Sequence, residues 1–426
     1  MWPGGSACSR ISGIVSGFLK TRADMESAHG APIVTSGCKR AGRVIGVRPC
    51  GELKGPCSNF SYEPDPLQWH HINKKGGGCG PFYLCLITPT SALTMDLVSR
   101  MFKSFPLNNW CGKLWATKHD VAEIKDRIRV ATAEIIASKY NIEPTEIRVD
   151  SDYPSCNPGL CRFDNRWVLI ARSSNKVNYN DGDYRQHGDT NNTSNMIVFL
   201  NDDFTVHDSS PLDDGILRHS GSPAEFGLQD SRLFQFGNDL CGIAAGIGRH
   251  KKSRRSITQI IFKISGNRIS EYRPLPSPHG HIIERNWSPL VIDEKLFVFY
   301  STNPPIAIEV GPDDIASSQI ENLNGHFDIR GGTPYLPWKD GFLSIGHLAP
   351  IHLDGKKHYL HTLILLDKEF RLLETSEPFF FQRRGIEFAC GLAHHDGCLI
   401  VSYGVADRGC RILSIPTSVI DRMLVT

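Results

Sequence analysis

The chain contains 426 residues, of which 40% are hydrophobic and 22% are charged, so it has enough apolar content for a core and is not wholly disordered. Its 47 Lys and Arg residues nearly balance its 45 Asp and Glu residues, and the net charge of +2 gives no overall field that favours nucleic acid. We therefore expect no nucleic-acid partner, and the absence of a run of about 18 apolar residues predicts no transmembrane segment. The 39 Gly and 26 Pro residues favour a turn-rich β protein over a helical bundle.

Residues 1–115 carry no sustained hydrophobic period, and stretches such as Gly76-Gly77-Gly78 are typical of loops. We predict an irregular or disordered N-terminal segment over 1–115. Within it, the apolar stretch 11–19 is short and broken by Gly and Ser, so it makes a poor signal peptide, and we expect a cytoplasmic protein.

The 13 Cys residues are odd in number and include no CxxC pair, so they fit neither a regular disulfide framework nor a zinc ribbon. We interpret them as structural or adventitious thiols, and we expect no metal and no cofactor.

Residues 116–145 differ from the preceding segment, because apolar residues recur at helical spacing between Val121 and Ile136. Asp120 is suited to cap such a helix, and Asn141 with Pro144 marks its end. We predict a helical connector over 116–145 that packs against the main domain.

From Cys156 onward, short β-rich runs flank small polar turns, and each of five turns precedes an apolar run. The five turns are Asp164-Asn165, Asn238-Asp239, Asp293-Glu294, Asp340-Gly341 and Asp396-Gly397. Successive turns lie 75, 55, 46 and 56 residues apart, and a spacing of about 50 residues between strand-built units indicates propeller blades. The long first step leaves room for a polar insertion over 175–195.

The predicted fold is therefore all-β, a five-bladed β-propeller over 146–426, preceded by a short helix and a poorly structured N-terminal segment. A two-sheet sandwich is the alternative, but it does not explain the repeat.

A β-hairpin brings the start of its first strand beside the end of its second, so polar residues at those two places share one rim. At the strand starts these are Asn157, Asp230, Arg232, Arg285, Asn286, Arg330, Thr333 and Glu387, and at the strand ends they are Arg172, Asn303, His347 and Asp407. A ring of blades points them all at one mouth of the central channel, which predicts a ligand site. The alternative for any one of them is a structural ion pair between blades.

These residue types suit carbohydrate chemistry. Asp230 and Asp407, with Glu387 as a third candidate, are groups that serve as general acid or base in glycosyl transfer. Arg and His clusters hold phosphate through charge-assisted hydrogen bonds. The aromatic residues nearby that are candidates for stacking on a sugar ring are Trp287, Tyr335 and Trp338.

Several motifs together resemble the five-bladed propeller family of mannoside phosphorylases and their relatives, the β-1,2-mannosyltransferases. The matching pieces are Asn157-Pro158, Ile170-Ala171-Arg172, Gln229-Asp230-Ser231-Arg232, Arg285-Asn286, the run from Gly341 to His347, and Tyr403-Gly404-Val405-Ala406-Asp407. Their order and spacing agree with the family over about residues 155–415, and residues 1–145 are not covered.

The resemblance implies a role for each matching residue. Asp230 would be the proton donor of an inverting reaction, with a proton relay through a sugar hydroxyl. The residues that would bind the sugar are Asn157, Arg172 and Asp407. Arg232, at the same strand start as Asp230, is a further candidate for substrate binding. Those that would face the attacking or departing anion are Arg285, Asn286, Arg330 and His347.

Two departures from the family pattern change the expected chemistry. The Glu before the acid is Gln229 here, which leaves Asp230 easier to ionise. In the family, an Arg that binds phosphate precedes a Pro. The corresponding pair here is Asn303-Pro304, and loss of that cation weakens the case for inorganic phosphate as the nucleophile.

The sequence thus predicts an enzyme, a glycosyltransferase or glycoside phosphorylase, that moves a hexosyl unit, mannosyl by resemblance, to or from a glycan. Its partners would be a carbohydrate substrate and a phosphorylated or nucleotide sugar donor. One alternative is a glycoside hydrolase, which needs a second carboxylate about 6.5–9.5 Å from the acid, for which Glu387 and Asp407 are candidates. The other is a non-catalytic propeller that binds glycans or proteins.

Overall fold

The computed structural model describes residues 126–424 except 190, 251–252, 312–314, 317–328, 349–350 and 354, together with two short strands nearer the N-terminus. Those strands, β1 (Gln68–His71) and β2 (Phe82–Cys85), pair antiparallel within a separate compact unit, Met1–Ile128. The remainder of the predicted segment 1–115, and residues 116–125 of the predicted connector with the proposed cap Asp120, lie outside the described residues.

The described part of the predicted connector is only partly helical. Residues 126–132 are helical, and a second short helix, α5 (Ile136–Tyr140), ends at Asn141 in the left-handed conformation. Between them lies β3 (Glu134–Ile135), which pairs with β26 (Phe379–Phe380). The chain then enters β4 (Thr145–Ile147) and leads into the main domain.

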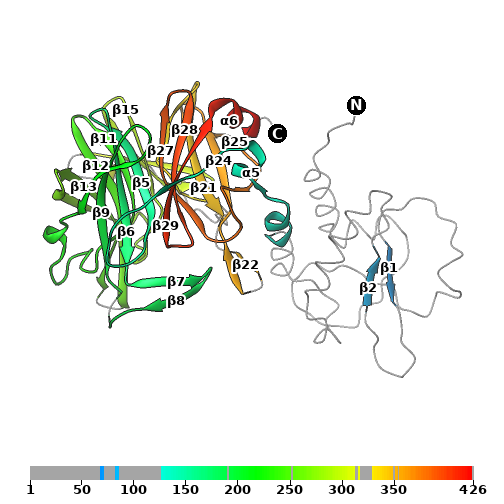
Figure 1. The fold of residues 1–426 in the computed structure, drawn as a ribbon, viewed down its shortest axis with the longest axis horizontal. Helices are drawn as coiled ribbons and strands as arrows, with labels where there is room; N and C mark the ends of the chain where they lie inside the picture. The colour runs from blue at the N-terminus through cyan, green and yellow to red at the C-terminus, as the bar shows by residue number, and fades with distance from the viewer. Residues whose placement is uncertain are drawn as a thin grey trace, which may run out of the picture. The chain divides into compact units, whose positions relative to one another are not determined.

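Within the described residues, five sheets of at least four strands follow one another along the chain (Figure 1). The first holds β5 (Ser155–Phe163), β6 (Arg166–Ser174), β9 (Thr193–Leu200) and β10 (Val206–Pro211). The second holds β11 (Leu228–Phe236), β12 (Asp239–His250), β13 (Ser253–Ser265) and β14 (Arg268–Leu275). The third holds β15 (Ser288–Ile292), β16 (Lys295–Thr302), β17 (Pro305–Val310) and β18 (Ile315–Ala316).

The last two sheets each take in a segment from the N-terminal side of the domain. The fourth holds β19 (Ile329–Arg330), β20 (Leu336–Trp338), β21 (Gly341–Leu348), β24 (His361–Leu366) and β25 (Leu372–Thr375), extended by β26 and β3. The fifth holds β27 (Glu387–His395), β28 (Cys398–Val405) and β29 (Gly409–Pro416), and β4 completes it as the outer strand. A C-terminal helix, α6 (Thr417–Leu424), packs against this end of the domain.

Buried apolar clusters join each sheet to the next and close the ring. Ile170 of the first sheet packs with Phe262 of the second, Ile243 of the second with Val298 of the third, and Phe299 of the third with Ile364 of the fourth. Ile345 of the fourth sheet shares a cluster with Val401 of the fifth, and Ile400 of the fifth shares one with Leu169 of the first. This is the arrangement of a β-propeller and excludes the two-sheet sandwich.

The inner strands of the ring approach one another closely. A Cβ on Gly159 of β5 would lie 1.9 Å from the carbonyl oxygen of Ser231 in β11, so only Gly fits there. On the other side of β5, Ser402 Oγ of β28 donates a 2.5 Å hydrogen bond to the carbonyl of Pro158. The first sheet is therefore fixed to both the second and the fifth.

All five predicted turns join paired antiparallel strands. Three have the predicted bounds, whereas β12 begins at Asp239 and β21 at Gly341, one residue earlier than expected. Asp164, Asn165, Asp293 and Glu294 have positive φ angles, which match the twist of two-residue hairpins.

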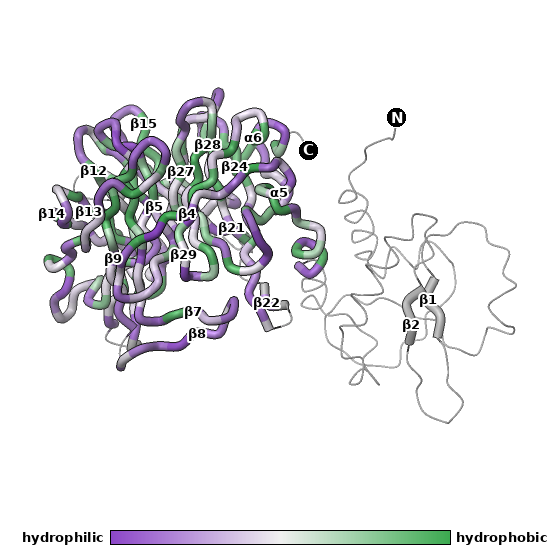
Figure 2. The backbone as a smooth tube through the Cα atoms, viewed as in Figure 1, coloured by the Kyte–Doolittle hydropathy of each residue, from purple (hydrophilic) through white to green (hydrophobic). Residues whose placement is uncertain are grey.

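Two additional hairpins project from the ring. One is β7 (Lys176–Asn180) with β8 (Asp183–Gln186), which forms much of the polar insertion over 175–195. The other is β22 (Ile351–Leu353) with β23 (Lys356–His358). Figure 2 shows hydrophobic residues along the strands of the ring and mostly hydrophilic ones along β7 and β8. No helix among the described residues is long and apolar enough to cross a membrane.

Candidate active site

Irregularities in the inner strands aim two polar side chains into the mouth of the ring. The pairing of β5 with β6 shifts register between Cys156 and Gly159, and that of β11 with β12 shifts between Gln229 and Arg232. Asn157 and Asp230, which lie in these two bulges, both have positive φ angles, of 48° and 56°. The Asn157 side-chain amide donates a 2.8 Å hydrogen bond to Oδ1 of Asp230.

Arg172, at the end of β6, connects two carboxylates from distant parts of the ring. Its Nη1 lies 2.9 Å from Oδ1 of Asp230, and its Nη2 lies 3.2 Å from Oδ1 of Asp407. Asp407 stands in the turn between β28 and β29 with a φ of 50°. All three side chains are at most 13% exposed, so water screens these ion pairs weakly.

The surroundings of Asp230 keep its carboxylate ionised. Burial alone would raise its pKa, but the charge of Arg172 and the hydrogen bond from Asn157 outweigh burial, and Arg285 and Arg232 add to them. The pKa of Asp230 is therefore lowered below its ordinary value. At neutral pH this group is suited to accept a proton rather than to donate one.

A cavity of about 330 Å³ opens above this network. Eight of the nine predicted site residues line it: Asn157, Arg172, Asp230, Arg285, Asn286, Arg330, His347 and Asp407. They come from all five sheets or the turns beside them, as expected for the mouth of a ring.

The ninth predicted residue, Arg232, does not reach the cavity. It is fully buried, and it donates hydrogen bonds to the carbonyl oxygens of Gly332 and Asp230 and to the side chain of Asn286. Arg232 therefore fixes the backbone that carries Asp230, and it is not among the residues that line the cavity.

The cavity is strongly cationic. The cations that line it are Arg172, Lys176, Arg255, Arg285, Arg330 and Lys357, against two carboxylates, Asp230 and Asp407. His347 adds no charge, because burial and the neighbouring His361 and Arg330 hold its pKa well below its ordinary value. Such a surplus of positive charge is suited to bind phosphate.

The two projecting hairpins contribute cavity residues that the sequence did not reveal. Tyr184 of β8 donates a 2.6 Å hydrogen bond from its hydroxyl to Oδ2 of Asp407. Lys176 of β7 and Lys357 of β23 lie 5.3 and 5.0 Å from the centre of its ring. The backbone N–H of Lys357 donates to the carbonyl of Asp181, so the two hairpins meet at the mouth. The only sequence signal was the polar insertion over 175–195, which includes Lys176 and Tyr184 but not Lys357.

Four other candidates lie elsewhere. Glu387 is buried with its oxygens bonded to the backbone N–H groups of residues 381–383, and burial raises its pKa to about 7. The prediction that Trp287, Tyr335 and Trp338 stack on a sugar is wrong, because all three are buried in clusters between sheets. They therefore act in the core.

Asn303, where the family pattern has an anion-binding Arg, is exposed and precedes a cis proline. It is not among the residues that line the cavity. Among the described residues, no cluster of His, Cys, Asp or Glu is suited to hold a metal ion.

The sequence matches no protein-family model and no curated protein. Its structure is similar to that of β-1,2-mannobiose phosphorylase from Listeria innocua, with a TM-score of 0.48 and 15% identity over 66% of this chain and 96% of that one. Two proteins from Leishmania mexicana are also similar over 69% of this chain and 94% of theirs. They are MPT-4, a mannose phosphorylase in complex with phosphate (TM-score 0.46, 13% identity), and MPT-1, a GDP-Man-dependent mannosyltransferase (0.47, 14%). At such identities a shared fold does not fix a function.

Proposed function

We propose that this protein is an inverting glycosyltransferase that moves a hexosyl unit, mannosyl by the resemblance of its motifs, from a phosphate-bearing donor to a carbohydrate acceptor. The observation that carries the proposal is the position of Asp230, which is held by Asn157 and Arg172 in the lining of a cationic cavity. Asp230 is the general base, and the cations bind the donor's phosphate.

The reaction needs a base and a stabilised leaving group, and the cavity offers both. The acceptor hydroxyl oxygen bonds to the anomeric carbon, the bond from that carbon to the phosphate oxygen breaks, and the hydroxyl proton passes to Asp230 directly or through a sugar hydroxyl. The phosphate leaves with the electron pair. Arg285 and Arg330, which line the cavity, supply charge to stabilise it, so no acid is required.

Hydrolysis of a glycosidic bond is less well served by this arrangement. It requires a protonated acid and a carboxylate base for water. Asp230 has a lowered pKa, Glu387 is occupied by backbone N–H groups, and Asp407 is bonded through both oxygens, to Arg172 and Tyr184. Hydrolysis of a glycosidic bond also involves no phosphate group for the cations of the cavity to bind.

The decisive experiment replaces the base without changing its shape. Asp230→Asn should lower transfer by about 10²- to 10⁴-fold, the range expected for a general base. Product formation is followed with mannose 1-phosphate and with nucleotide-linked mannose as separate donors. Asp164→Asn, in an exposed hairpin turn with positive φ, is the matched control and should retain full activity. Full activity in Asp230→Asn would refute the proposal.

A further inference from the structure

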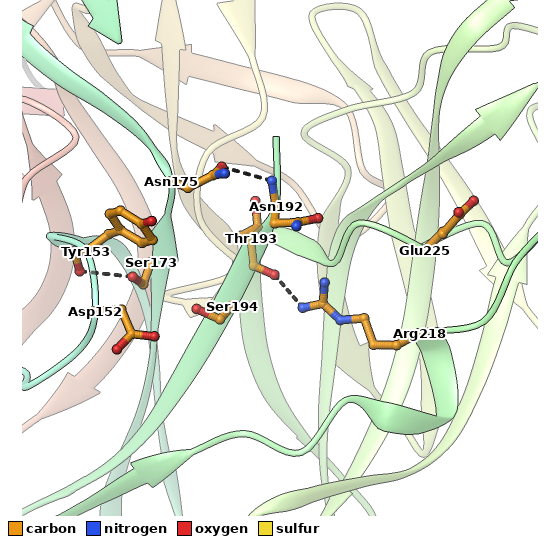
Figure 3. A pocket seen from close by; sticks show the side chains of 9 residues that line it. All are labelled: Asp152, Tyr153, Ser173, Asn175, Asn192, Thr193, Ser194, Arg218 and Glu225. Atoms are coloured by element: carbon orange, nitrogen blue, oxygen red, sulfur yellow. Dashed lines mark hydrogen bonds between the residues drawn. The ribbon is translucent and has the colours of Figure 1, made fainter. Parts of the chain in front are cut away.

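A second cavity, of about 470 Å³, lies beside the first and has no place in the proposed reaction (Figure 3). Its volume is within the range of ligand-binding pockets. Asp152 and Tyr153, which precede β5, stand on one side, and Arg218 and Glu225, which precede β11, stand on the other. Ser194 of β9 lies between them, so the cavity is set between the first and second sheets.

The two cavities share one wall. Ser173 and Asn192 line the second cavity, whereas their chain neighbours Ser174 and Asn191 line the first. The side chain of Gln229 spans the wall, since its amide donates 3.2 Å to Thr193 Oγ1 and its carbonyl accepts 3.3 Å from Arg285. Only this wall therefore separates a chain molecule that reacts at Asp230 from a second polar cavity.

The second cavity has a different chemical character from the first. Its lining includes a single cation, Arg218, which is already bonded to both oxygens of Asp214 and to the carbonyl of Thr193. The two carboxylates of the lining, Asp152 and Glu225, leave it slightly negative. Such a surface repels phosphate, whereas hydroxyl groups pair well with carboxylates and hydroxyls.

Its polar wall is also held in place before any ligand binds. The Asn175 amide donates 2.6 Å to the His187 carbonyl and accepts 2.9 Å from the Asn192 backbone, and Ser173 Oγ donates 2.9 Å to the Tyr153 carbonyl. Glu225 Oε2 is buried, lies 3.4 Å from Arg249 Nε, and makes no hydrogen bond. This oxygen is therefore already paired with a cation, and the fixed polar wall lowers the entropic cost of binding a ligand.

We infer that this cavity is a subsite for a neutral oligosaccharide, which holds the acceptor chain at a distance from the hydroxyl that reacts. The Tyr153 ring provides an apolar face for a sugar, and Asp152 and Ser194 accept hydrogen bonds from its hydroxyl groups. The inference rests on the proposed transfer reaction, because it assigns the acceptor, and not the donor, to the anion-repelling cavity.

The test fills the cavity and compares acceptors of different length. Ser194 is exposed on β9 and touches no reacting group, so Ser194→Phe blocks the hollow without entering the core. With the full chain, β-1,2-linked mannotetraose should have a KM about tenfold lower than mannose. Ser194→Phe should abolish that difference by raising the tetrasaccharide KM, with kcat and the KM for mannose unchanged.

Ser209→Phe, on the neighbouring strand β10 and outside both cavities, is the matched control and should behave as the unaltered protein. Equal KM values for both acceptors in the unaltered protein, or equal losses for both in Ser194→Phe, would overturn the subsite while leaving transfer intact. A calorimetric titration with mannotetraose alone separates the two proposals. Saturable binding that Ser194→Phe removes would retain the subsite even if no donor supports transfer.

Discussion

Tyr184 donates a 2.6 Å hydrogen bond to Asp407, although 223 positions separate the two residues in the sequence. Tyr184 lies in a hairpin inserted into the first sheet, and Asp407 lies in a turn of the fifth. Burial and the charge of Asp407 raise the pKa of the Tyr184 hydroxyl, so it stays protonated and continues to donate. The contact fixes one oxygen of Asp407 while Arg172 fixes the other.

Tyr184→Phe removes this donor and little else. We expect kcat/KM to fall about tenfold, because one oxygen of Asp407 loses its partner, with a loss of about 1 kcal/mol or less in the free energy of unfolding. Tyr179→Phe, at an exposed position of the same hairpin, loses a hydrogen bond to His187 and serves as the control. Equal activity in both variants would show that the Tyr184 contact does not order the site.

Arg172→Gln removes the charge between Asp230 and Asp407. We expect the protein to lose about 3 kcal/mol or more of stability at pH 7, because two buried carboxylates lose their counter-charge. The pKa of Asp230 should rise, so the residual activity should disappear at a higher pH than in the unaltered protein. The measurements are chemical unfolding and the acid limb of the pH profile. An unchanged acid limb would argue that Asp230 is not the base.

The lowered pKa of Asp230 also affects stability. A carboxyl group with a lower pKa in the folded than in the unfolded state stabilises the fold above its unfolded pKa and loses that contribution as pH falls. We therefore expect the thermal unfolding midpoint to fall as the pH is lowered below about 4, and to fall less in Asp230→Asn. Thermal unfolding between acid and neutral pH measures the difference, and parallel curves would contradict the prediction.

Glu387 should have the opposite effect. Burial raises its pKa to about 7, so between its ordinary pKa and that value the folded protein binds a proton that the unfolded chain releases. Stability should therefore decline as pH rises through this window, by on the order of 3 kcal/mol from this group. Glu387→Gln cannot ionise and should remove this slope, although it also loses an acceptor for the Phe381 N–H. A slope unchanged in the variant would contradict the assignment.

Gly159→Ala tests the close approach of β5 and β11. The added methyl group would lie 1.9 Å from the Ser231 carbonyl oxygen, and backbone cannot move aside cheaply. We expect a loss of about 3 kcal/mol or more and reduced activity, because Ser231 is adjacent to Asp230. Gly355→Ala, at positive φ but in open space, is the control and should lose about 1 kcal/mol. Chemical unfolding compares them, and equal losses would contradict the steric argument.

The hairpin turns and their spacing were sufficient to predict the propeller, because positive-φ residues such as Asp164 and Asp293 are local signals. The convergence of Asn157, Arg172, Asp230 and Asp407 followed from ring geometry together with those turns. Arg232 was expected at the same rim as Asp230 because both belong to one strand start, but the register shift between Gln229 and Arg232 separates their side chains. Tyr184 and Lys357 were not found because their positions depend on contacts between inserted hairpins, which have no local pattern.

The strand β4 determines when the last sheet of the propeller can be completed during synthesis. It is the outer strand of the last sheet, although it comes from the start of the domain, so that sheet stays incomplete until both ends of the domain are present. Arg172 and Asp407 stand on the two sides of this junction. During synthesis the Arg172–Asp407 ion pair can therefore form only after the last sheet has been made, whereas the partners of Asp230 are made with the first three sheets.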